Sequence, residues 1–155
     1  MDIEKAKNYA LNLLSSKMYT CRDMNFKLVS KGFDREVAEE TVSVLCRAGL
    51  LDDAQYAEYY IHDAVNIGMK GMFRIKQELL KKGVASSVID KAIENAEVDT
   101  SAQLMEYIEA RFTDSDFSDR RGVEKVKAHL LRRGFEYSEI NKCFKMLDIK
   151  VNGGE

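Results

Sequence analysis

The sequence contains no proline and no tryptophan, and its 155 residues include no apolar run near the length of a membrane span. Without proline, nothing interrupts a helix interior through a missing backbone donor. The charged N-terminal residues lack the apolar core of a secretion signal, so we expect a cytoplasmic protein without a membrane segment. Alanine, leucine, glutamate and lysine are abundant and are good helix formers. The composition therefore favours an all-α protein.

Residues with catalytic or metal-binding chemistry are scarce. The three cysteines, Cys21, Cys46 and Cys143, show no CxxC spacing, so we expect neither a disulfide framework nor a zinc site. Each is expected to be a small apolar core residue in a reducing compartment. His62 and His129 have no metal-ligand spacing around them, and no glycine-rich phosphate motif is present. We expect no enzyme activity, no catalytic residue, no metal and no cofactor.

The rest of the chain shows helical periodicity. Apolar residues at i, i+3, i+4 and i+7 predict a first helix over residues 4–16 and eight more along the chain, including one over 121–133. Thr20 has the position of an N-cap before the second helix, and Asp34 that of an N-cap before the third. A polar loop is expected over 113–119. These assignments predict a chain built only from helices and short connections.

An internal repeat organises these helices. Gly32, Gly83 and Gly134 each follow a basic residue and are 51 residues apart. The same step of 51 residues aligns apolar positions, as in these sets: Met24, Ile75 and Val126; Leu28, Leu79 and Leu130; Ala38, Ile89 and Ile140. The pattern predicts three tandem three-helix repeats, over residues 1–49, 50–98 and 99–150. Residues 151–155 are expected to form a disordered tail.

The net charge of −2 conceals an uneven distribution. The predicted second helix of each repeat is basic, with net charges of +3, +4 and +4, whereas residues 52–66 carry −4. Basic side chains at the same place in three repeats are suited to an acidic protein surface or a phosphate backbone. The candidate contact residues are Lys70, Arg74, Lys76, Lys81, Lys82, Arg120, Arg121, Lys125, Lys127, Arg132 and Arg133.

Two groups of residues have an alternative, structural interpretation. Basic residues just before a helix-ending glycine also stabilise the helix dipole, so Lys82 and Arg133 are open to both roles. Asp52 and Asp53 are better explained as helix caps than as a catalytic pair. Tyr56 and Tyr60 have the spacing of a core face, although tyrosines beside basic residues can also stack on single-stranded bases.

The central stretch carries an ordered set of short motifs: Gly49-Leu50-Leu51-Asp52-Asp53, Tyr56-Ala57, Lys70-Gly71, Arg74-Ile75, Glu78-Leu79 and Lys82-Gly83. This set resembles the signature of the RecX family, bacterial regulators of the RecA recombinase. Lys31-Gly32-Phe33 and Arg133-Gly134-Phe135 are similar to the family's repeating helix ends. The resemblance extends over nearly the whole chain.

The resemblance implies three-helix repeats in an elongated, curved array that binds the RecA filament on single-stranded DNA. It also implies a protein without catalytic residues that modulates RecA in DNA repair and the SOS response. We expect the protein to be a monomer. Inhibition of RecA's strand-exchange, ATPase and co-protease activities is the expected effect. Members of the family are often strongly basic, so the slightly acidic charge favours contact with the filament over contact with bare DNA. Weak direct DNA binding by a helical-repeat protein, and a helical adaptor for another protein, remain the alternatives.

Overall fold

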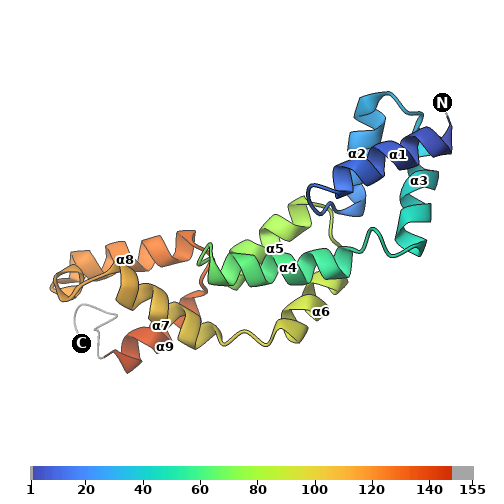
Figure 1. The fold of residues 1–155 in the computed structure, drawn as a ribbon. Helices are drawn as coiled ribbons and strands as arrows, with labels where there is room; N and C mark the ends of the chain where they lie inside the picture. The colour runs from blue at the N-terminus through green and yellow to red at the C-terminus, as the bar shows by residue number, and fades with distance from the viewer. Residues whose placement is uncertain (1, 148–155) are drawn as a thin grey trace. The chain divides into compact units, whose positions relative to one another are not determined.

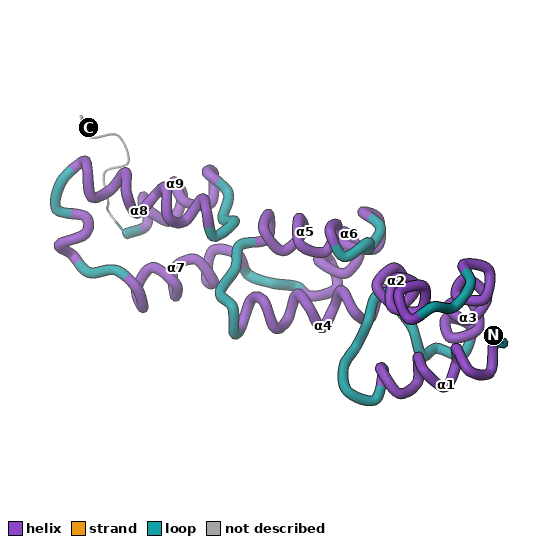
Figure 2. The backbone as a smooth tube through the Cα atoms, turned by 90° about the horizontal axis from the view of Figure 1, so that it is seen from above, coloured by secondary structure: helices purple, strands orange, loops and turns teal. Residues whose placement is uncertain are grey.

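The computed structural model describes residues 2–147, and in this range every regular element is a helix (Figures 1 and 2). The predicted all-α class is therefore confirmed. The elements, in chain order, are α1 (Ile3–Leu14), α2 (Cys21–Lys31), α3 (Arg35–Arg47), α4 (Asp53–Asn66), α5 (Met72–Lys81), α6 (Ser86–Ala96), α7 (Thr100–Arg111), the 3₁₀ helix η1 (Asp114–Phe117), α8 (Arg120–Arg132) and α9 (Tyr137–Met146). The expected tail over 151–155 lies outside the described residues. None of the described helices is long and apolar enough to cross a bilayer.

Local sequence signals determine most helix ends. Thr20 accepts a hydrogen bond from the Asp23 backbone N–H at 3.1 Å and so caps α2, as predicted. Gly32, Gly83 and Gly134 have φ values of +117°, +92° and +99°, a left-handed conformation that glycine adopts without a steric penalty. These glycines end α2, α5 and α8.

Two expectations about local structure need correction. Asp34 occupies the N-cap position of α3, but its side chain makes no capping hydrogen bond. The polar stretch expected as a loop over 113–119 contains the 3₁₀ helix η1, because Thr113 and Asp116 form a reciprocal capping box. Both differences concern short polar segments, where several local hydrogen-bonding patterns compete.

The structure divides into two compact units. Unit 1 comprises Met1–Tyr60 with Leu79–Asn95, and unit 2 comprises Ile61–Glu78 with Ala96–Glu155, described as far as residue 147. Helices α4 and α5 each contribute residues to both units. The middle repeat predicted over residues 50–98 is therefore divided between the two units.

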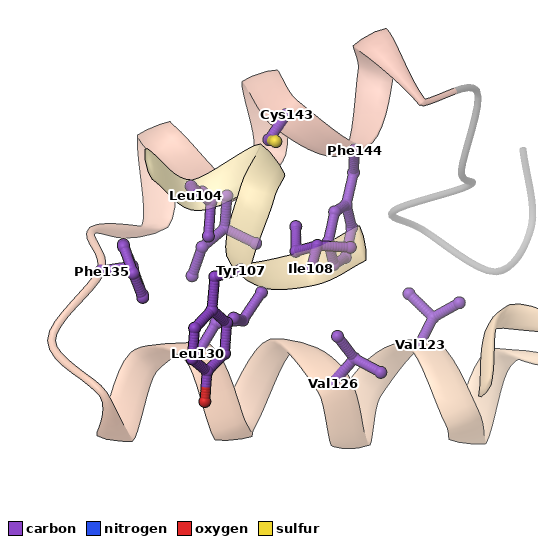
Figure 3. Close-up of a cluster of buried hydrophobic side chains, with 10 residues drawn as sticks. Leu104, Tyr107, Ile108, Val123, Val126, Leu130, Phe135, Cys143 and Phe144 are labelled. Atoms are coloured by element: carbon purple, nitrogen blue, oxygen red, sulfur yellow. The ribbon is translucent and has the colours of Figure 1, made fainter. Parts of the chain in front are cut away.

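Each unit has its own apolar core. In unit 1, buried residues of α1, α2 and α3 form a cluster that includes Ala10, Met24, Leu28 and Leu45. The larger cluster of unit 2 joins α7, α8 and α9, and Figure 3 shows its members facing one another: Leu104, Tyr107, Ile108, Val123, Val126, Leu130, Phe135, Cys143 and Phe144. The buried positions follow the periodicity read from the sequence.

The cysteines depart from their predicted role. Cys143 is a buried core residue, as expected, and its Sγ lies 4.0 Å from the sulfur of Met105. Cys46 is exposed and Cys21 is only half-buried. The expectation that all three are core residues is wrong for Cys46, because its position near the end of α3 falls outside the apolar face of that helix.

Candidate partner-binding surface

The starts of the second helices make long-range hydrogen bonds to backbone carbonyl oxygens. In unit 1, the hydroxyl of Thr20, just before α2, donates to the carbonyl oxygen of Lys82, just after α5, at 2.9 Å. In unit 2, the N–H of Gly71, just before α5, donates to the carbonyl oxygen of Arg133, just after α8, at 2.9 Å. The two contacts join positions that are equivalent at a step of 51 residues, although the donor is a side-chain hydroxyl in the first and a backbone N–H in the second. The glycine-containing helix ends therefore act as docking points as well as stop signals.

Close packing accompanies the contact in unit 2. The N–H of Phe73 donates to the carbonyl oxygen of Gly134 at 3.1 Å. A Cβ atom on Gly71 would overlap the backbone of Gly134, and a Cβ atom on Gly134 would lie 2.7 Å from the backbone nitrogen of Arg74. Only glycine leaves room for these segments to approach so closely.

Several of the predicted contact residues are engaged in holding the fold. The guanidinium of Arg133 donates to the carbonyl oxygens of Gly68 and Met69 and lies over the Tyr107 ring at 5.7 Å. Met69 has a left-handed backbone conformation, with a φ of +48°. The Arg133 side chain therefore links the carbonyl oxygens of two consecutive residues in this turn. Arg133 thus has a structural role that differs from the dipole stabilisation considered from the sequence, since it binds carbonyl oxygens in a distant part of the chain.

Lys70 and Arg74 share one carboxylate. The Lys70 ammonium lies 2.8 Å from Glu78 Oε1, and Arg74 Nε lies 3.2 Å from Glu78 Oε2. The main chain of Lys70 is also engaged, since its carbonyl oxygen accepts from the Gln103 side chain at 2.6 Å. These charges are partly neutralised within unit 2. The i to i+4 spacing of Arg74 and Glu78 was visible in the sequence and indicates such a pair.

Lys127 is largely buried, with 6% of its surface exposed. Its ammonium lies 3.5 Å from the Tyr137 hydroxyl and 3.6 Å from Glu124, and it sits over the Tyr137 ring at 5.0 Å. The alkyl stem covers apolar surface while the charged end reaches polar partners, as is common for lysine. Lys127 is therefore placed to pack α8 against α9.

A smaller group of basic residues lies at the surface. Arg120, Arg121, Lys125 and Arg132 of α8 and Lys81 of α5 are exposed, whereas Lys76 and Lys82 are half-buried. At 100° per residue, Arg121, Lys125 and Arg132 fall within roughly 40° of one another around α8. We call these three residues the α8 strip. Val126 and Leu130 point from the other side of α8 into the core, which Figure 3 shows.

His129 of α8 lies among aromatic and arginine side chains. Its Nε2 lies 2.7 Å from the Tyr107 hydroxyl, and its ring stacks on Tyr107 with centroids 5.8 Å apart. Burial lowers the pKa of His129, and the positive charges of Arg111, Arg132 and Arg133 lower it further. The imidazole is therefore held in its neutral form, able to exchange a hydrogen bond with the Tyr107 hydroxyl.

The acidic residues at the start of α4 act as caps. Asp52 accepts a hydrogen bond from the Gln55 N–H at 3.2 Å, which confirms the capping role for this residue. Asp53 accepts instead from the Cys21 N–H at 2.9 Å and so caps α2, a partner that sequence spacing did not indicate. Within residues 2–147, no three histidine, cysteine or acidic side chains gather to hold a metal ion.

Tyr56 and Tyr60 are half-buried and stack on each other with centroids 6.2 Å apart. Their mutual stacking fits the packing role weighed for them from their spacing. Tyr59, on another side of α4, is 55% exposed.

These features define an all-helical protein of tandem three-helix domains with basic side chains on a second helix. Family models for RecX match in two places: the first three-helix domain at residues 6–45 and the second at residues 52–93. The regulatory protein RecX of Halorhodospira halophila is 36% identical over 145 residues, covering 94% of this chain and 89% of the relative. That of Trichlorobacter lovleyi is 32% identical, covering 88% and 91%.

Solved structures agree with this assignment. The crystal structure of RecX from Lactobacillus salivarius superposes with a TM-score of 0.80 at 32% identity, covering 95% of this chain and 97% of that one. The chain therefore belongs to the RecX family, and the resemblance drawn from the central motifs is confirmed. Its relatives are named as regulatory proteins, so the chain belongs to a family of regulators and not of enzymes.

Proposed function

We propose that this protein binds the RecA filament on single-stranded DNA and inhibits RecA's recombinase, ATPase and co-protease activities. It would act as a monomer in the cytoplasm, in DNA repair and the SOS response. Membership of the RecX family supports a regulatory role. The observation that carries the contact surface is the α8 strip, which presents Arg121, Lys125 and Arg132 on the exposed side of a helix anchored by its opposite face.

The predicted contact residues can be divided according to the contacts that their side chains make within unit 2. Lys70, Arg74, Lys127 and Arg133 make contacts that hold unit 2 together. We assign the partner contact to basic residues that are exposed at the end of α5 and on α8, together with the half-buried Lys82: Lys81, Lys82, Arg120, Arg121, Lys125 and Arg132. A charge that is already paired gains less from a second partner, because its first pair must be broken or shared.

The overall charge favours a protein–DNA filament over DNA alone. Affinity for bare DNA comes largely from neutralising phosphates, and a chain with a net charge of −2 repels a polyanion outside its basic patches. A filament offers protein surface as well, where complementary patches of both signs contribute. The acidic α4 region, with −4 over residues 52–66, has no role in binding phosphate but suits a basic patch on a protein.

The test is a titration of the protein into RecA that hydrolyses ATP on single-stranded DNA. We expect the wild-type protein to suppress hydrolysis at or below stoichiometric amounts. The triple variant Arg121→Glu, Lys125→Glu, Arg132→Glu should need about tenfold more protein for the same effect, since three lost surface contacts of up to ~1 kcal/mol each exceed the 1.4 kcal/mol that tenfold requires.

The matched control reverses three exposed basic residues outside the second helices: Lys5, Arg35 and Lys142. This control changes the net charge by the same amount as the strip variant and leaves the strip intact. It should therefore retain inhibition if the α8 strip makes the contact. Equal inhibition by both triple variants would remove the strip from the proposal. No effect of the wild-type protein over the whole titration would remove RecA inhibition itself.

Direct DNA binding is the second candidate, and the same strip favours it. It predicts binding to bare single-stranded DNA with an affinity that falls steeply as salt rises. A measurement by fluorescence anisotropy at several salt concentrations separates the two functions. Binding that is absent near physiological salt, together with RecA inhibition, supports the filament as the partner.

A further inference from the structure

Cys21 and Cys46 lie against each other in unit 1. Their Sγ atoms are 3.1 Å apart, although the residues are separated by 25 positions in the sequence. Cys21 is the first residue of α2, and Cys46 is the penultimate residue of α3. A disulfide bond has a length of about 2.0 Å, so the two sulfur atoms need to approach by only about 1 Å to form one.

The proximity of the two thiols is held by the surrounding structure. The Cys21 N–H donates to Asp53 Oδ1 at 2.9 Å, and the neighbouring Thr20 donates to the Lys82 carbonyl oxygen at 2.9 Å. On the other side, Leu45, next to Cys46, is buried in the core of unit 1. Both cysteines are thus fixed on helices rather than carried by mobile loops.

Exposure distinguishes the two thiols. Cys46 is exposed and open to small oxidants, while Cys21 is half-buried behind it. Burial raises the pKa of the Cys21 thiol, as do its contact with Cys46 and the nearby charge of Asp53. Because the thiolate is the reactive form, Cys21 is the less reactive of the two toward a free oxidant.

We propose that Cys21 and Cys46 form a reversible oxidation site, which closes to an intramolecular disulfide when the protein meets hydrogen peroxide or an organic hydroperoxide. The Cys46 thiolate attacks the peroxide oxygen, which breaks the O–O bond and leaves a sulfenic acid on Cys46. The other oxygen leaves as hydroxide, or as alkoxide from an organic hydroperoxide, and takes up a proton to give water or an alcohol. The Cys21 sulfur then attacks the Cys46 sulfur, and the hydroxyl leaves as water. The two thiols lose two electrons and two protons, and hydrogen peroxide becomes two molecules of water.

The disulfide joins the start of α2 to the end of α3. It closes a loop that contains the glycine end at Gly32 and the whole of α3 as far as Cys46. Dithiol reductants reverse the step by thiol–disulfide exchange. This site is separate from the proposed RecA inhibition, because no side chain assigned to that contact takes part in it. Lys82 contributes only its carbonyl oxygen, which accepts from the neighbouring Thr20.

The experiment uses the reduced full-length protein, treated with hydrogen peroxide and then alkylated in denaturant with iodoacetamide. Of the three thiols, we expect Cys21 and Cys46 to be lost together and Cys143 to stay alkylatable. Before alkylation, the intact mass should fall by two hydrogen atoms, and a peptide map should place the link between Cys21 and Cys46. Dithiothreitol should restore the original mass.

Two variants make the test specific. Cys46→Ser, at an exposed position, should keep the helical content and lose the intramolecular link, whereas Cys143→Ala should form the link as the wild type does. The proposal is overturned if the oxidised wild-type protein keeps all three alkylatable thiols. It is equally overturned if the disulfide joins two chains, or if Cys46→Ser loses mass in the same way as the wild type.

Discussion

The glycines that end α2, α5 and α8 offer a graded test of how the units are packed. Gly32, Gly83 and Gly134 hold the same repeat position and similar left-handed backbone conformations. Their surroundings differ. A Cβ atom on Gly32 meets nothing within 4 Å. The nearest atoms to one on Gly83 belong to the Arg22 side chain, including its Cβ at 2.8 Å, and those to one on Gly134 are the backbone and Cβ of Arg74. Alanine at each position therefore causes the same backbone strain with a different steric cost.

The expected magnitudes follow from these neighbours. A left-handed conformation costs a residue with a Cβ roughly 1–2 kcal/mol, and this applies to all three variants. Gly134→Ala must also displace the segment of Arg74, which is held by the hydrogen bonds from Gly71 to Arg133 and from Phe73 to Gly134. Two hydrogen bonds of about 1 kcal/mol each bring the loss for Gly134→Ala to about 3–4 kcal/mol.

The assay is urea unfolding followed by circular dichroism, with hydrogen exchange at the Phe73 amide as a local probe. We expect the loss of stability to increase in the order Gly32→Ala, Gly83→Ala, Gly134→Ala. Gly83→Ala lies between the other two because the end of the Arg22 side chain can move, whereas its Cβ, 2.8 Å away, moves only with the backbone of α2. The Phe73 amide should exchange faster only in Gly134→Ala. Equal destabilisation by Gly32→Ala and Gly134→Ala would refute the docking role of the helix end.

Three further predictions concern single side chains. Glu78→Gln should lower the free energy of unfolding by at most about 1 kcal/mol, since it removes the shared partner of Lys70 and Arg74, and the loss should shrink in 1 M salt, as measured by urea unfolding. Thr20→Val should cost about 2 kcal/mol, because it removes an N-cap and a buried hydrogen bond, whereas Thr20→Ser should retain most of the stability. His129 has a lowered pKa in the folded protein, so the unfolded chain binds a proton first, and stability should fall as the pH drops below about 6.5. His129→Gln should flatten this part of the thermal-stability profile between pH 5 and 7.

Each of these predictions has a result that contradicts it. If the loss of stability in Glu78→Gln does not shrink in 1 M salt, the ion pairs of Glu78 contribute nothing measurable to the free energy of unfolding. If the Thr20→Val variant is as stable as the wild-type protein, the buried hydrogen bond to Lys82 does not contribute to stability. A wild-type melting temperature that does not change between pH 5 and 7 would contradict the lowered pKa of His129. A His129→Gln variant with the pH dependence of the wild type would mean that another group takes up the proton.

Much of the fold could be predicted because its signals are local. A helix is held by hydrogen bonds between residues four positions apart, so apolar spacing, the cap at Thr20 and the glycine at 134 are legible in a short window of sequence. The recurrence of the same pattern after 51 residues then indicates the tandem three-helix organisation. The central motifs were sufficient to connect the chain with the RecX family.

The candidate site was less predictable, because the positions of charged residues in the sequence do not show which side chains make hydrogen bonds or ion pairs within the fold. Lys127 and Arg133 look like surface residues in their helix, yet one is buried against Tyr137 and the other binds the carbonyl oxygens at Gly68 and Met69. Arg121, Lys125 and Arg132 stay exposed. Partners 65 residues apart, such as Arg133 and Gly68, leave no mark in a local window.

The sequence alone therefore determined the helices and their glycine ends, because each depends on hydrogen bonds and apolar contacts within a few residues. The recurrence of this pattern after 51 residues indicated the tandem three-helix organisation. Only the tertiary structure decided that Thr20 meets Lys82, that Cys21 meets Cys46, and that the helix end at Gly134 receives the start of α5. These contacts depend on how separate helices pack, and packing is determined by the shapes of many side chains together.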